Sequence, residues 1–257
     1  MKSLGTVVGV VLYARDAVVV RSGGAPPQTE VTRGEVTMFS RKSRQRLAFV
    51  ANNTTVEFRT IITLTYPKEY PHDGSLCKKH LREWLTQLQA YTGGADYLWF
   101  VEFQRRGAPH FHILTDYPMP RRRPLAKSFR LWVSRTWYTT CGELDIKHLV
   151  AGTNTQAIRN RENCGAYAVK YASKMEQKHV PPDYRNVGRF WGHSRAVAPR
   201  PLFEVECTEE DIRAALVGEP YAPTDDVELY KVLYNKAAAL AVAGLDTDLD
   251  LDRDVDT

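Results

Sequence analysis

Two histidines and a glutamate stand close together in the sequence, in a spacing that could hold a divalent metal ion. His110 and His112 are two residues apart in a predicted strand, so both side chains point to one face. Glu102 has the matching parity on the preceding predicted strand, and a hairpin turn around Gly107 would fold it back beside the histidines. Two imidazoles and a carboxylate suit a metal with open coordination positions, which can polarise a phosphate oxygen.

Gln104 shares the parity of Glu102 and could also reach the metal or its waters. A carboxylate is the better cation ligand, which favours Glu102. The alternative interpretation is that His110 and His112 are no more than partly buried polar residues of a strand, because an isolated His-x-His pair is a weak signal.

A second group of reactive side chains falls on a predicted helix over residues 162–178. Tyr167, Lys170, Tyr171 and Lys174 follow the i, i+3, i+4, i+7 spacing that places side chains on one helical face. A lysine ammonium near a phenol favours the phenolate and can stabilise charge that develops on a phosphate. The alternative is that the tyrosines pack on the core while the lysine stems extend to water.

Taken together, the two groups fit metal-assisted transesterification at a phosphodiester. The metal would activate the phosphate, a tyrosine would attack in line, and a 3′-hydroxyl would leave.

Hydrophobic periodicity and turn residues indicate an ordered mixture of strands and helices. The predicted strands cover residues 5–21, 56–66, 97–104 and 110–115, and the predicted helices cover residues 34–50, 76–91, 126–139, 162–178 and 226–243. The acidic end, LDTDLDLDRDVDT, is predicted to be disordered.

Charge is unevenly distributed along the 257 residues. Residues 201–257 hold 15 acidic and 4 basic side chains, whereas residues 1–200 hold 15 acidic and 31 basic ones. A basic body favours a polyanionic partner such as nucleic acid. The four cysteines form no CxxC pair, and no apolar run is long enough to span a membrane, so we expect a cytoplasmic protein with no membrane partner.

Three stretches resemble the motifs of HUH-type rolling-circle replication initiators, and they occur in the expected order. EFQRRGAPHFHIL resembles the HUH motif with its upstream acidic ligand, and FRTIITLTYP is similar to the first motif. AYAVKYASK resembles the two-tyrosine motif of initiators from small single-stranded-DNA phages, both the isometric-phage A proteins and the filamentous-phage gene II type. GRFWGHSR, residues 188–195, is similar to a segment that follows the tyrosines in phage and plasmid initiators.

The resemblance implies an α+β HUH endonuclease fold, with a central antiparallel sheet of about five strands, RRM- or ferredoxin-like, flanked by helices. It implies Mg²⁺ or Mn²⁺ as cofactor and a 5′-phosphotyrosine intermediate. The residues that match are Glu102, His110 and His112 as metal ligands, Tyr167 and Tyr171 as nucleophiles, and Lys170 and Lys174 as motif lysines.

The function expected is a site-specific nickase that starts rolling-circle replication at an origin in single-stranded DNA and rejoins strands at termination. The sequence has no GxxxxGK[ST] motif, so a separate helicase and a DNA polymerase are expected partners, in the cytoplasm of a bacterial host. The expected domains are a β-rich extension over residues 1–39, the endonuclease over residues 40–200, and a helical, acidic, partly disordered tail over residues 201–257.

Several basic and aromatic residues are weaker candidates for DNA contacts, since such side chains bind phosphates and stack on bases. They are Arg41, Arg44, Arg121, Arg122, Arg123, Trp191, His193 and Arg195. A solvated loop or core packing would explain them as well. The rival functions are a plasmid relaxase, a single-tyrosine HUH transposase, and a non-catalytic RRM-like nucleic-acid-binding module.

Overall fold

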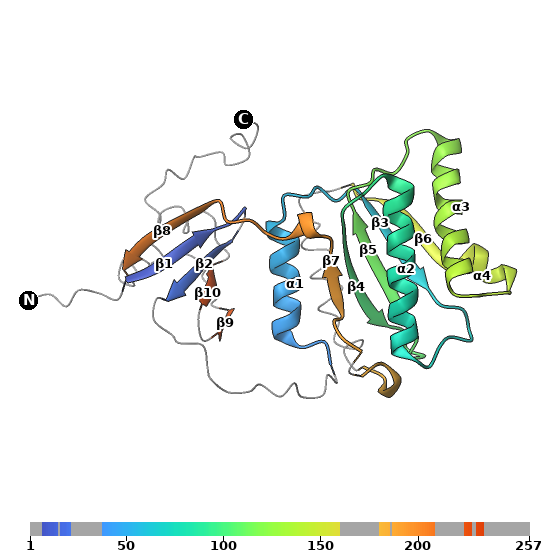
Figure 1. Ribbon diagram of the computed structural model, residues 1–257, viewed down its shortest axis with the longest axis horizontal. Helices are drawn as coiled ribbons and strands as arrows, with labels where there is room; N and C mark the ends of the chain where they lie inside the picture. The colour runs from blue at the N-terminus through green and yellow to red at the C-terminus, as the bar shows by residue number, and fades with distance from the viewer. Residues whose placement is uncertain are drawn as a thin grey trace, which may run out of the picture. The chain divides into compact units, whose positions relative to one another are not determined.

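The chain forms two compact units, each built around its own β-sheet. The computed structural model describes residues 7–14, 16–21, 38–159, 180–185, 187–208, 224–227 and 230–233. The first unit comprises residues 1–31, 52–55 and 199–257, and the second comprises residues 32–51 and 56–198. Figure 1 shows both sheets and the helices of the second unit.

The second unit contains a five-stranded sheet in which every described pairing is antiparallel. The strand order is β6-β3-β5-β4-β7, so β5 lies at the centre and β6 and β7 form the edges. The strands are β3 (Thr60–Thr65), β4 (Tyr97–Phe103), β5 (Pro109–Thr115), β6 (Thr153–Ala157) and β7 (Trp191–His193). This confirms the expected α+β architecture with a central antiparallel sheet flanked by helices.

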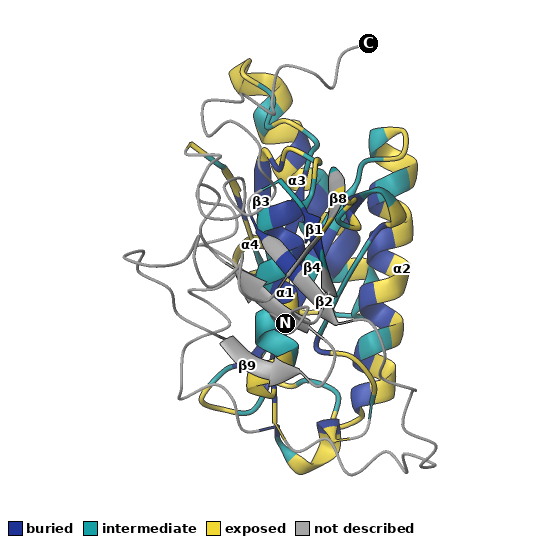
Figure 2. Cartoon of the chain, turned by 90° about the vertical axis from the view of Figure 1, so that its left-hand side faces the viewer, coloured by how far each residue is buried: buried dark blue, intermediate teal, exposed yellow. Residues whose placement is uncertain are grey.

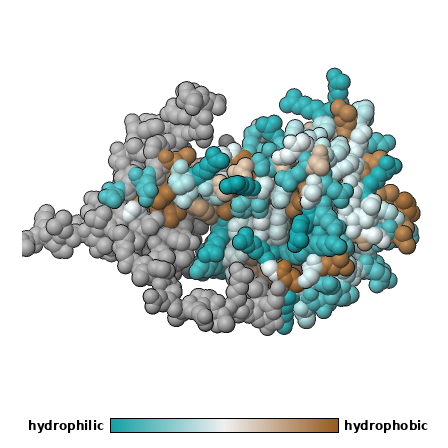
Figure 3. Space-filling view, in the orientation of Figure 1, coloured by the Kyte–Doolittle hydropathy of each residue, from teal (hydrophilic) through white to brown (hydrophobic). Residues whose placement is uncertain are grey.

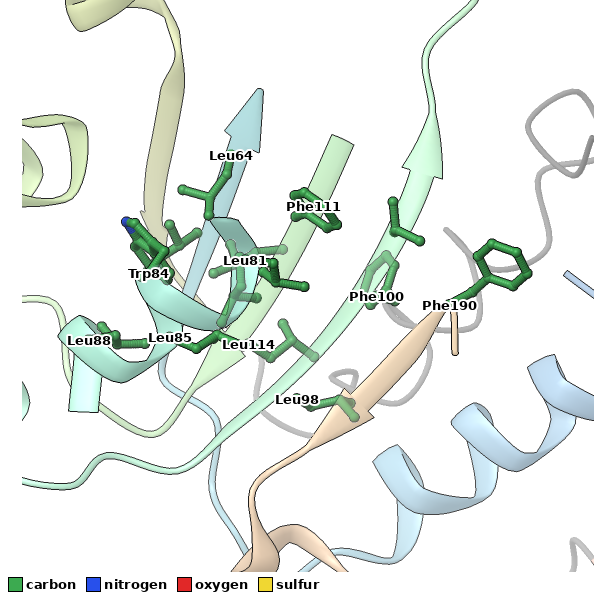
Figure 4. Close-up of a cluster of buried hydrophobic side chains, with 14 of the residues drawn as sticks. Leu64, Leu81, Trp84, Leu85, Leu88, Leu98, Phe100, Phe111, Leu114 and Phe190 are labelled. Carbon is green, nitrogen blue, oxygen red and sulfur yellow. The ribbon is translucent and has the colours of Figure 1, made fainter. Parts of the chain in front are cut away.

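Helix α2 (Gly74–Thr92) covers one face of this sheet. It begins where the side chain of Asp73 accepts hydrogen bonds from two backbone N–H groups of the first turn, and it ends at Gly93, whose φ of 78° is left-handed. Its buried residues lie along the side that faces the sheet, and its outer side is exposed (Figure 2). Figure 4 shows Leu81 and Trp84 of α2 above Leu64 of β3.

The remaining helices of the second unit complete the core. They are α1 (Arg41–Asn53), α3 (Arg123–Thr140), α4 (Ile146–Ala151) and the 3₁₀ turns Pro182–Tyr184 and Arg195–Val197. Phe129, Val133 and Trp137 of α3 are fully buried. Around α4, by contrast, Ile146 and Val150 are exposed, and Figure 3 shows hydrophobic surface on that side of the molecule.

The first unit holds a second antiparallel sheet, of order β8-β1-β2-β10-β9. Its strands are β1 (Val7–Leu12), β2 (Ala17–Arg21), β8 (Phe203–Thr208), β9 (Thr224–Val227) and β10 (Tyr230–Leu233). The valine-rich alternation of residues 5–21 therefore does form two strands. The expected helix over residues 226–243, and with it the helical character of the tail, is wrong where the structure describes the chain, because β9 and β10 pair there.

The physical reason is visible in the sequence of β10, which reads Tyr-Lys-Val-Leu. A β-branched and an aromatic residue suit a strand, and pairing with the valines of β2 outweighs the helical pattern of the alanine-rich residues beyond it. No helix among the described residues is long and apolar enough to cross a membrane.

Candidate active site

Strand register places the predicted metal-binding residues on one face of the sheet in the second unit. Glu102 of β4 lies opposite His110 of β5, and His110 lies opposite Thr65 of β3. In the next row on the same face, Phe100 lies opposite His112, which lies opposite Thr63. Directly opposed residues of antiparallel strands share a face, so two adjacent rows bring the acid and both histidines together.

Glu102 and His112 form the closest pair in this group. The imidazole Nε2 of His112 is 3.1 Å from Oε2 of Glu102. Both residues are almost enclosed, with 3% of His112 and 6% of Glu102 exposed. The ring of Phe100 stacks on the His112 imidazole at a centroid distance of 5.0 Å, and the His110 ring follows at 4.7 Å. The pair is therefore held in one position by packing as well as by hydrogen bonding.

Two threonines of β3 orient the two imidazoles in the same way. Oγ1 of Thr65 is 2.9 Å from Nδ1 of His110, and Oγ1 of Thr63 is 3.3 Å from Nδ1 of His112. When each Nδ1–H donates to its hydroxyl oxygen, Nε2 carries the lone pair that a metal ion requires. Gln104 approaches the same ring nitrogen of His110, with 3.5 Å between Nε2 and Nδ1, so it contacts the histidine as a neighbour.

The backbone of Thr65 is fixed from the far side by α3 and α4. Its carbonyl oxygen accepts hydrogen bonds from Nε1 of Trp137 at 2.9 Å and from Nε2 of His148 at 2.7 Å. Its own N–H donates to the carbonyl oxygen of Gly152 at 2.8 Å. The threonine beside His110 is consequently among the most restrained residues of the strand.

The turn between β4 and β5 is fixed by Arg106. Its guanidinium donates to the backbone carbonyl oxygens of Tyr66 at 2.6 Å and Lys68 at 3.0 Å, and also to that of Pro67. The same group donates to Oε1 of Gln104 at 2.8 Å. Gly107 has a φ of 86°, which a side chain would strain, so the glycine is what allows the tight turn. The predicted hairpin is confirmed.

The donor set fits a divalent ion chemically. Among the described residues, no three His, Cys, Asp or Glu side chains stand in a ready-made coordination arrangement. Nevertheless, two imidazoles whose Nδ1 atoms face hydroxyls and one carboxylate beside them supply neutral nitrogen and anionic oxygen ligands for Mg²⁺ or Mn²⁺.

Of the weaker DNA-contact candidates, the structure brings some to this face. Trp191 of β7 lies opposite Phe100, and its Nε1 donates to Oγ of Ser43 at 3.0 Å. Ser43 stands in the first turn of α1 between Arg41 and Arg44, so this basic turn adjoins Trp191. The Trp191 ring also stacks on that of His193, with 6.0 Å between centroids.

Other candidates lie elsewhere. Arg121, Arg122 and Arg123 follow the far end of β5, which carries the chain roughly 17 Å beyond His110. The strand therefore separates this exposed run from the histidines. Arg195 begins a 3₁₀ turn after β7. Tyr167, Lys170, Tyr171 and Lys174 lie outside the described residues.

Sequence reasoning missed Thr63, Thr65, Phe100 and Arg106. The signal for the threonines was present in the ITLT run of β3, where two residues of equal parity both carry hydroxyls. Nothing local indicated Arg106, because its carbonyl partners follow another strand.

Comparison with known protein families agrees with this geometry. Residues 59–176 match the model of a replication-associated protein family, that of ORF2 and the gene II protein, and this stretch includes both the histidine strand and the paired tyrosines. No curated protein matches the chain. One solved structure with some similarity is the N-terminal nuclease domain of non-structural protein 1 of minute virus of mice, which is described as having Zn²⁺ in its active-site pocket and recognising DNA at the replication origin.

That domain is 9% identical over 54% of this chain and 75% of its own, with a TM-score of 0.27. Through the stretch that carries the candidate site, the chain belongs to the replication-associated protein family of ORF2 and the gene II protein.

Proposed function

We propose that the chain is a metal-dependent endonuclease of the HUH type, which nicks single-stranded DNA at a replication origin with a tyrosine. The observation that carries this proposal is the joint orientation of His110 and His112 by threonine hydroxyls, with Glu102 beside them, inside a replication-associated family segment. Such a group has the ligands of a metal site and the outer hydrogen bonds that hold them.

Glu102, His110 and His112 would hold Mg²⁺ or Mn²⁺, which when bound supplies positive charge to a phosphate oxygen. Thr63 and Thr65 keep the imidazoles in the tautomer that leaves Nε2 for coordination. Because Glu102 and His112 are nearly enclosed, few water molecules compete with the phosphate at this point.

Tyr167 or Tyr171 would supply the nucleophile. The phenolic oxygen attacks phosphorus, the bond between phosphorus and the 3′-oxygen breaks, and the 3′-oxygen takes up a proton to become a free hydroxyl. The 5′ side of the strand stays on the tyrosine as a phosphodiester, so the bond energy is kept for rejoining. Lys170 and Lys174, on the same predicted helical face, would favour the phenolate.

The arrangement argues against the rival of a non-catalytic RRM-like module. That function needs aromatic side chains presented on the open face of the sheet for base stacking. Phe100, which holds the corresponding position on β4, is fully buried and stacks on His112.

The decisive test is incubation of the full chain with a single-stranded origin oligonucleotide and Mn²⁺, followed by a denaturing gel. We expect a shortened strand with a 3′-hydroxyl and a protein band shifted by covalently attached DNA. The Tyr167→Phe/Tyr171→Phe double variant should give neither product, whereas Tyr138→Phe on α3 should behave as wild type. Binding without cutting or attachment by the wild-type chain would refute the proposal in favour of a binding module.

A further inference from the structure

A cavity of about 320 Å³ lies on the face of the sheet opposite the candidate active site. It is bounded by α2, by β4 and by the segment that leads into β7. On β4, Trp99 and Tyr97 line it, and their parity is opposite to that of Glu102, so the two sites point away from each other. This volume is at the lower end of the range for small-molecule sites.

The lining combines cations with aromatic rings. Lys78 and Arg82 come from one side of α2, and Arg189 comes from the segment before β7. Leucines of α2 complete the wall, and none of the described residues that line the cavity is acidic. Such a lining attracts a ligand with a negative charge and a planar apolar part.

Lys78 is held within this cavity and is withdrawn from water. Its Nζ lies 4.3 Å from the centroid of the Trp99 ring and donates a hydrogen bond to the carbonyl oxygen of Arg189. Burial lowers the pKa of Lys78 to about 7, with only a small opposing effect from Cys77. A cation held at this cost is one that an incoming anion would stabilise.

The Trp99 ring depends on the absence of a side chain at Gly192. A Cβ atom built at that position would come within 2.9 Å of Nε1 of Trp99. Gly192 lies directly opposite Trp99 on the edge strand β7, so the glycine gives the indole the space to lie against the backbone. The aromatic wall of the cavity is thus fixed in place by the edge strand.

We propose that this cavity binds one nucleotide unit, with its phosphate on Lys78, Arg82 and Arg189 and its base against Tyr97 or Trp99. The same chemistry is offered by a nucleotide within a single DNA strand and by a free nucleotide. The site needs no metal and lies on the other face of the sheet, so it goes beyond the proposed cleavage reaction and does not depend on it.

The test measures binding in EDTA, where cleavage cannot occur, by tryptophan fluorescence and calorimetry with the full chain. The probes are dTMP, inorganic phosphate and a thymidine 12-mer without terminal phosphates. Quenching by dTMP identifies a free-nucleotide site, and binding of the 12-mer without dTMP identifies a strand site. Either result supports the proposal when it depends on the residues below.

Arg82→Gln and Arg189→Gln carry the test, because both side chains are exposed and their loss should not unfold the chain. Each should lower the salt dependence of 12-mer binding by about 0.7 in log–log slope, the effect of one lost phosphate contact on a single strand. Trp99→Leu should weaken binding roughly 5- to 150-fold through lost stacking. Lys79→Gln is the matched control, since Lys79 is the neighbouring α2 lysine that pairs with Glu83 at 3.8 Å.

The proposal is overturned if no probe binds, if phosphate alone binds as well as dTMP, or if Arg82→Gln, Arg189→Gln and Lys79→Gln are indistinguishable. The catalytic proposal fails separately. A wild-type chain that binds the 12-mer through Arg82 but never cuts DNA would disprove cleavage and leave the nucleotide site intact. His112→Ala should leave this binding unchanged, because His112 lies on the opposite face.

Discussion

Thr65 and His110 lie directly opposite each other on β3 and β5, with Oγ1 of the threonine 2.9 Å from Nδ1 of the imidazole. The backbone of Thr65 is at the same time anchored to Trp137 and His148. The strand next to the proposed metal ligands therefore transmits the rigidity of the helical layer to the histidine.

Thr65→Val should reduce Mn²⁺ affinity about 10- to 100-fold, the usual cost of removing an outer hydrogen bond to a metal-binding histidine. Thr65→Ser should keep most of the affinity because it keeps the hydroxyl. Titration calorimetry with Mn²⁺ on the DNA-free chain measures this directly. Thr155→Val, on β6 and on the other face of the sheet, is the control. Equal affinities for the Val and Ser variants at position 65 would show that the hydroxyl does not orient the ring.

Removing the metal ligands should separate cutting from binding. His112→Ala and Glu102→Ala should abolish nicking while much of the DNA affinity remains, because phosphate contacts come mainly from arginine and lysine. Mn²⁺ should partly restore the Glu102 variant. Gel assays of cleavage and binding, run side by side, measure both effects. Cleavage that persists in EDTA would show that no metal takes part.

Arg106→Met should lower the free energy of unfolding by about 1–2 kcal/mol, since an exposed guanidinium loses hydrogen bonds to several carbonyl oxygens. The same change should weaken Mn²⁺ binding, because Arg106 also holds Gln104 next to His110. Urea unfolding and metal titration supply the two readings. Arg105→Met, at the neighbouring exposed position of the same turn, should change neither.

The two tyrosines should be partly interchangeable. Tyr167→Phe and Tyr171→Phe should each retain some cleavage, because tyrosines one helical turn apart, about 5.4–6 Å along a helix axis, could reach one phosphate site in turn. Both single variants should be worse at strand transfer than at the first nick. Mass spectrometry of trapped adducts should find DNA on the remaining tyrosine. Adducts confined to one position would make the enzyme a single-tyrosine nickase.

Lys78 should make stability rise with pH between pH 7 and 8.5. Its pKa is about 7 in the folded chain and 10.5 in a free side chain, so the unfolded state binds more protons in this window. The wild type should therefore gain stability over Lys78→Met by up to about 1.4 kcal/mol per pH unit. Urea unfolding at several pH values gives the difference. Parallel curves for the two proteins would contradict the lowered pKa of Lys78.

The upper limit of that window is set by two cysteines. Burial raises the pKa of the Cys77 and Cys141 thiols above the ordinary value of 9, so the folded state keeps their protons longer than the unfolded state. Their contribution to stability is present below pH 9 and is lost as the pH rises further. Measurements above pH 9 would mix this loss with the gain from Lys78.

Local patterns predicted what depends on local rules. The alternation in residues 97–115 predicted the hairpin and the shared face of Glu102, His110 and His112, because strand parity needs no tertiary information. The short edge strands β6 and β7 were not predicted, since their pairing with β3 and β4 joins residues distant in sequence. The same reason explains why Arg106 and the cavity beside Trp99 escaped notice.

The hairpin of β4 and β5 carries all three proposed metal ligands on a single short turn of chain. Closing a short loop costs little conformational entropy, so these residues can meet early in folding, before the edge strands arrive. The tyrosines, in contrast, come from a later part of the sequence. The metal pocket and the nucleophile are therefore separable modules, and an evolving chain can exchange its tyrosine segment while it inherits the hairpin unchanged.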